Sequence, residues 1–174
     1  MPELKKQPKH YSLHIPVKPQ VKQFLLYHFG ADYKMSFRDF LGPYMMGIFQ
    51  KNIDWTWDID QNEYSEKYKV ITTDKFFLRY QVNSLSNYQI HLFNRFIIEL
   101  FNDRMVDFIH SLEMLGIDNK KAILHWCERY QLDEGSEDWY QTFKKNYYRN
   151  KNKYKKSVSK VSPTISIQKI TLAS

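Results

Sequence analysis

The stretch SNYQIHLFNRFIIELFNDRMVDFIHSLEML (residues 86–115) decides the fold of this chain of 174 residues. Ser86, followed by Gln89 one turn later, matches a capping box, and Gly116 is a residue type that ends helices. Between them, apolar side chains recur at the three- and four-residue spacing of one helix face: Ile90, Phe93, Ile97, Phe101, Met105, Phe108, Leu112 and Leu115. The stretch therefore predicts one long helix.

The first half of this predicted helix is apolar on further sides, at Leu92, Phe96, Ile98 and Leu100. A helix that is apolar around most of its surface is buried around most of its surface. We therefore expect the N-terminal elements of the chain to pack around this half.

The N-terminal segments predict short helices and one extended stretch. Prolines keep residues 11–19 extended, because a residue that precedes proline avoids the helical conformation. Residues 19–30 predict a helix with proline in its first turn and Gly30 at its end. Residues 36–50 predict one or two short helices, interrupted at Gly42-Pro43.

Two or three strands are predicted next. In NIDWTWDID (52–60), Ile and Trp alternate with Asp and Thr, which is typical of a half-buried strand. Residues 67–73 predict a second strand, joined to the first as a hairpin through QNEYSE (61–66). Residues 76–82 predict a third.

Two more helices are predicted after the long one. The first covers residues 119–131 and places four large or buried-type side chains on one face: Ile123, Trp126, Cys127 and Tyr130. The last begins near Asp138, with Ser136 as its N-cap and acidic residues at the positive end of its dipole.

The predicted fold is α+β and mostly helical, with a small antiparallel hairpin or sheet and short helices packed on a long central helix, followed by a helix-turn-helix-like pair. We divide the chain into an N-terminal α+β part (1–84), a helical part (85–150), and a tail (151–174) that is first basic, then Ser/Thr-rich and flexible. A content of 43% hydrophobic and 17% aromatic residues agrees with a globular protein.

Composition also limits the setting and the chemistry. Cys127 is the single cysteine, and the sequence contains neither a signal-peptide pattern nor the roughly 18 consecutive apolar residues that span a bilayer. We therefore expect a cytoplasmic protein in a reducing compartment, with no membrane partner. Phosphate-binding loops and the common nucleophile and kinase motifs are not found, so no catalytic residue, cofactor or metal is predicted.

Positive charge is concentrated in FKKNYYRNKNKYKK (143–156). Seven of the chain's 26 basic residues lie there without a single acid, and the 19 bases that remain equal the 19 acids, so this segment carries the whole net charge of +7. A concentrated positive field attracts polyanions by releasing their counterions.

Helical periodicity separates this segment into an apolar and a basic face. One face combines the residues predicted to pack inward: Trp139, Phe143, Asn146 and Tyr147. The other carries the residues we predict to contact nucleic acid, DNA rather than RNA: Gln141, Lys144, Lys145, Tyr148, Arg149, Lys151 and Lys155.

The order of the last elements carries a family resemblance. A long helix, a shorter helix, a glycine-containing turn and a basic last helix resemble, over residues 118–152, the C-terminal helical module of small helix-turn-helix DNA-binding proteins of phages and mobile elements. The resemblance implies non-enzymatic DNA binding, in regulation or replication of such an element.

Three other interpretations stay open. The basic segment could be a solvated helix end, and the chain could be a structural or interaction protein, such as a phage component, that attaches or self-associates through its tail and its exposed aromatic residues. An enzyme would use the polar side of the long helix, where Glu99, Asp103, Asp107 and His110 recur. A loop at 58–66 begins like a calcium site but has Glu63 where that loop needs glycine.

Overall fold

A computed structural model describes residues 9–49, 61–73, 85–132 and 137–161, with side chains from 139 to 151 in the last segment. The chain is α+β and mostly helical, as predicted. In order, its elements are β1 (His10–Val17), α1 (Pro19–Phe29), β2 (Asp32–Lys34), α2 (Leu41–Phe49), the short 3₁₀ helix η1 (Gln61–Tyr64), β3 (Glu66–Thr73), α4 (Asn87–Met114), α5 (Asn119–Arg129) and α6 (Glu137–Val161).

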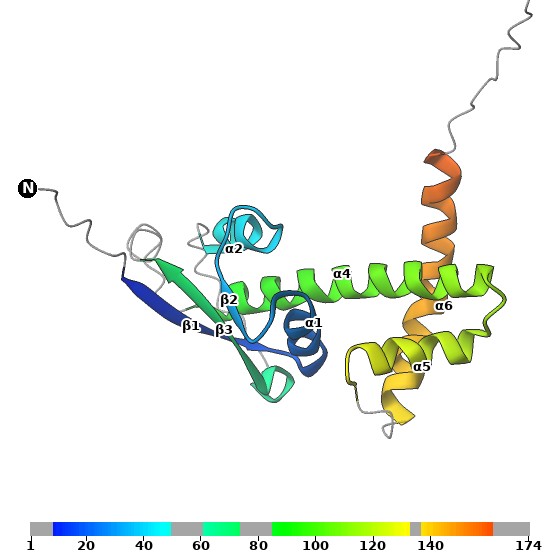
Figure 1. The fold of residues 1–174 in the computed structure, drawn as a ribbon, viewed down its shortest axis with the longest axis horizontal. Helices are drawn as coiled ribbons and strands as arrows, with labels where there is room; N and C mark the ends of the chain where they lie inside the picture. Colours follow the sequence, from blue (N-terminus) through cyan, green and yellow to red (C-terminus); the bar gives the residue numbers. More distant parts are fainter. Residues whose placement is uncertain (1–8, 50–60, 74–84, 133–136, 162–174) are drawn as a thin grey trace, which may run out of the picture.

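Helix α4 organises the fold. In Figure 1 it runs across the molecule, with the sheet, α1 and α2 around its N-terminal half and α5 and α6 against its C-terminal half. The predicted capping box is confirmed: the Gln89 backbone N–H donates to the Ser86 hydroxyl at 3.3 Å, and the Ser86 N–H donates to the Gln89 side chain at 2.9 Å. Gly116 follows the helix with a φ of 79°, a conformation that favours glycine.

The predicted apolar stripe of α4 is confirmed over most of its length. Its members Ile90, Phe93, Ile97, Phe101 and Met105 are buried, Phe108 and Leu112 are partly buried, and Val106 and Ile109 are buried beside them. Leu115, the last residue of the predicted stripe, follows the last residue of α4 and is 77% exposed.

The sheet is mixed, and its pairing differs from the predicted hairpin. Strand β3, which the pattern of residues 67–73 predicted, pairs antiparallel with β1 along its whole length and parallel with β2 on its other edge. Residues 61–64 form η1, and the partner of β3 is the N-terminal extended segment. The predicted strands at 52–60 and 76–82, and the predicted N-cap Ser136, lie outside the described residues.

Helix α2 runs through Gly42-Pro43, so the predicted interruption there is wrong. The Asp39 carboxylate accepts hydrogen bonds from the N–H groups of Leu41 and Gly42, at 3.0 and 3.1 Å, and so caps the helix start. A proline in the first turn removes a donor that would have no partner inside the helix. Glycine is required at 42, because a Cβ there would lie 1.7 Å from the backbone oxygen of Ser36.

Aromatic packing joins the two halves of the molecule at Phe101, in the middle of α4. Its ring centroid lies 5.1–5.9 Å from the centroids of four rings that come from three other helices: Phe24 of α1, Trp126 and Tyr130, which belong to or directly follow α5, and Phe143 of α6. Aromatic pairs at these separations add to the free energy gained from burying their surface. Phe101 is therefore a contact shared by α1, α5 and α6.

Asn94 fixes the corner between β1 and α1 onto α4. It is only 1% exposed; its Oδ1 accepts from the Lys18 N–H at 2.9 Å, and its Nδ2 donates to the carbonyls of Pro16 and Ile90, at 3.0 and 2.9 Å. One side chain thus satisfies the backbone groups on either side of the turn that leads from β1 into α1.

Replacing Asn94 with alanine should lower the free energy of unfolding by about 2 to 4 kcal/mol, because the Lys18 N–H and the Pro16 carbonyl would lose their hydrogen bonds. Urea denaturation followed by circular dichroism measures the change. The control is Arg95→Ala, which removes only an exposed ion pair with Glu99 and should change stability by less than about 0.5 kcal/mol. Equal effects of the two substitutions would contradict this role of Asn94.

Candidate nucleic-acid interface

Helix α6 is held on the body of the protein by its predicted inward face. Phe143 and Tyr147 are buried against α4 and α5, Trp139 is partly buried, and the Asn146 side chain donates to Asn102 at 3.5 Å. The helix continues to Val161, so residues 151–161 are helical and the predicted tail boundary at 151 falls inside α6. In Figure 1 α6 crosses α4 and projects beyond it.

The predicted basic face is exposed over the first half of α6. Five of the predicted site residues line one hollow of about 530 Å³: Gln141, Lys144, Lys145, Tyr148 and Arg149. Tyr148 is 51% exposed, so its ring is open to solvent beside the basic side chains. Among the described residues, no carboxylate forms an ion pair with Lys144, Lys145 or Arg149. Their charge is therefore free to act on a ligand.

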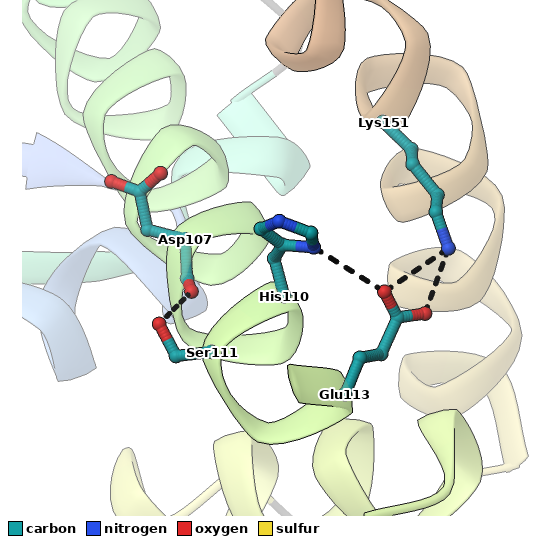
Figure 2. A network of polar contacts seen from close by, with 5 residues as sticks. All are labelled: Asp107, His110, Ser111, Glu113 and Lys151. Carbon is teal, nitrogen blue, oxygen red and sulfur yellow. Dashed lines mark hydrogen bonds and ion pairs between the residues drawn. The ribbon is translucent and has the colours of Figure 1, made fainter. Parts of the chain in front are cut away.

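Lys151 does not belong to this face, and its predicted outward position is wrong. It follows Tyr147 by one helical turn, so it lies on the same side of α6, with its Nζ 5.1 Å from the centroid of the Tyr147 ring. Figure 2 shows Lys151 reaching across to α4, where its Nζ lies 2.8 and 3.1 Å from the two carboxylate oxygens of Glu113. Lys155 lies within α6, beyond the described side chains.

Glu113 is a structural acid that sequence reasoning missed, because its partner is 38 residues away. Burial raises the pKa of Glu113, but hydrogen bonds from Lys151, Asn119 and His110 outweigh burial, and the pKa is lowered to about 2. The hydrogen bond with Glu113 raises the pKa of Lys151 in turn. The Tyr147 hydroxyl is buried close to this pair, but it makes no hydrogen bond of ordinary geometry with a described residue.

On the acidic side of α4, which an enzyme would use, Glu99 and His110 have different partners. Glu99 pairs with Arg95 at 3.0 Å, and His110 turns to Glu113 with its Nδ1 3.5 Å from the carboxylate. In Figure 2 the Asp107 carboxylate points away from His110. Within the described ranges, no three side chains of the types that bind metals are grouped together, and no helix is long and apolar enough to cross a membrane.

Replacing Glu113 with glutamine should destabilise the protein at pH 7 by about 1 to 3 kcal/mol, because Lys151 would lose its charged partner. A carboxyl whose pKa is lowered on folding stabilises the protein above its unfolded pKa, and this contribution is lost as the pH falls toward the folded pKa. The difference between parent and Glu113→Gln should therefore shrink steadily from pH 4.5 toward pH 2, the ordinary and folded pKa values.

Urea denaturation at a series of pH values from neutral to acid tests this expectation. Glu99→Gln on the same helix is the matched control, because it removes an exposed carboxylate and should have little effect at any pH. A stability difference for Glu113→Gln that does not depend on pH would contradict the ion pair as its cause.

In comparisons with family models, curated proteins and solved structures, nothing matches this chain. Its function is therefore argued from the chemistry of its own surfaces. The basic face of α6 is the described surface on which exposed cations, an exposed aromatic ring and a large hollow coincide.

Proposed function

We propose that this chain is a non-enzymatic nucleic-acid-binding protein that contacts DNA, rather than RNA, through the basic face of α6. The observation that carries the proposal is a group of cations that form no ion pair with a described carboxylate and lie around an exposed tyrosine at one hollow. Lys144, Lys145 and Arg149 neutralise phosphates, which sets affinity but not sequence preference. The resemblance of residues 118–152 to helix-turn-helix modules supports DNA as the ligand and a regulatory or replication role.

The remaining residues of the face have side chains suited to reading or stacking on bases. Gln141 and Lys145 have the donors and acceptors that recognise base edges, and they lie on the first turns of α6. Tyr148 offers a ring for stacking or a hydroxyl for a backbone hydrogen bond. Because Phe143 and Tyr147 hold the other side of the helix in the core, the face is presented by a rigid element.

The test removes three cations together, in the variant Lys144→Ala/Lys145→Ala/Arg149→Ala. Fluorescence anisotropy with labelled duplex and single-stranded DNA, at low and moderate salt, measures affinity and its salt dependence. The parent should lose affinity steeply with added salt, and the variant should bind more weakly, with a log–log salt slope smaller by about 2 to 3, because each phosphate neutralised contributes about 0.9.

A matched control is Lys34→Ala/Arg38→Ala/Lys67→Ala, which removes the same charge from exposed residues at the sheet end of the molecule. It should bind nearly as well as the parent. A folded α6 variant that binds DNA as tightly as the parent, with the same salt slope, would end the proposal.

Exposed apolar side chains favour a second candidate, an interaction protein. Phe37 and Phe40 are exposed before α2, and Met114 and Leu115 are exposed at the end of α4. Isolated exposed apolar residues are common, but paired ones suit a protein partner. A complex with a host or phage protein that survives salt high enough to release nucleic acid would favour this candidate over DNA binding.

A further inference from the structure

A second cationic site lies where α1, α4 and α5 meet, away from the basic face of α6. Two small cavities of about 140 and 130 Å³ adjoin there and share Arg129 and Tyr130 in their walls. The second cavity is also lined by His28, Arg104 and Trp126, with Asp107 as its acidic residue. Sequence reasoning missed this site, because its residues come from helices far apart in the chain.

Two arginines place positive charge at this cavity without forming an ion pair with a described carboxylate. The Arg129 guanidinium lies 5.1 Å from the centroid of the Tyr27 ring, and its Nε donates to the Tyr27 hydroxyl at 3.1 Å. This stacking holds the group in place but does not neutralise it. Neither Arg129 nor the exposed Arg104 forms an ion pair with Asp107 or with any other described carboxylate.

Trp126, in the wall of the same cavity, carries a buried donor for which no described residue is an acceptor. Trp126 is 1% exposed, and its indole N–H makes no hydrogen bond to a described residue. A buried polar group without a partner is costly, and an ion or water that binds there is a common explanation. The two guanidinium groups in the cavity wall are donors with positive charge, so the ligand that completes this cavity is an acceptor with negative charge.

The pKa of His28 is sensitive to the positive charge at this cavity. Its Nε2 lies 3.1 Å from the Tyr130 hydroxyl. Burial lowers the pKa of His28, and the charges of Arg104 and Arg129 lower it further. The imidazole is therefore a natural reporter of any anion that offsets those charges.

We propose that this cavity binds a phosphate group, held by the guanidinium groups of Arg104 and Arg129 beside the Trp126 ring. Guanidinium groups match phosphate oxygens with paired hydrogen bonds. The cavity of about 130 Å³ equals roughly four water volumes, which suits one phosphate group but not a whole nucleotide. The site does not depend on the function proposed for α6, since it uses other helices.

The test titrates inorganic phosphate into the intact protein at constant ionic strength and follows nuclear magnetic resonance signals. The Trp126 indole N–H signal, assigned by its loss in Trp126→Phe, should shift and saturate. The pKa of His28 should rise with bound phosphate, because the anion offsets the two arginine charges. Arg104→Gln should weaken binding about tenfold, the effect of losing one charged hydrogen bond, whereas Asp107→Asn should tighten it.

Arg38→Gln is the matched control, because it removes one exposed guanidinium that does not line the cavity and should leave phosphate binding unchanged. The site would be refuted if the Trp126 signal did not shift saturably, or if Arg38→Gln and Arg104→Gln weakened binding equally, which would mean that only the overall charge matters.

A second titration distinguishes a nucleic-acid phosphate from a free phosphate as the ligand. A short oligonucleotide is added to the Lys144→Ala/Lys145→Ala/Arg149→Ala variant. A shift of the Trp126 signal that phosphate competes away would identify a nucleic-acid phosphate as the ligand. A response to phosphate without a response to the oligonucleotide would identify a free phosphate or a small phosphorylated molecule.

Discussion

The ring of Phe101 touches aromatic side chains of α1, α5 and α6, and the arrangement of the C-terminal helices depends on this contact. Because protein interiors are close-packed, the sizes of these rings limit how near each helix approaches α4. Phe143 is the residue through which α6 joins the cluster. Its burial turns Lys144, Lys145 and Tyr148 toward solvent, so the outward face of α6 follows from the packing at the centre of α4.

Apolar packing holds the helices together, and two polar side chains on α4 fix where they lie along it. Near the N-terminal end, Asn94 binds the backbone on both sides of the β1–α1 corner. Near the C-terminal end, Glu113 binds Lys151 of α6. Hydrogen bonds are directional while hydrophobic contacts are not, so these two residues select one position among several that packing alone would allow.

The sequence predicted the features that depend on residues close together in the chain. The periodicity and capping box of α4, the buried face of α5, the start of α1 at Pro19 and the exposed part of the α6 face all depend on residues within a few turns of each other. The pairing of β3 with β1 and the position of Lys151 depend on partners far away in the sequence. Lys151 follows Tyr147 by four residues, so helical spacing alone could have placed the two side chains together, but Lys151 was predicted on the outward face; its acidic partner could be identified only from the fold. The burial of Asn94 could not be predicted from the sequence, because asparagine is normally expected at the surface.

The distribution of charge shows why counting residues along the chain is not enough. Outside residues 143–156 the bases and acids are equal in number, which suggests a neutral body. In the structure, four ion pairs use acids of the N-terminal elements and of the N-terminal half of α4, for example Glu63, Glu66 and Glu99. These acids are paired with other bases, and none of them forms an ion pair with Arg104 or Arg129. A chain whose other bases and acids are equal in number thus folds into a surface with separate positive regions. Lys151, although it lies in the basic segment, is neutralised by Glu113 of α4.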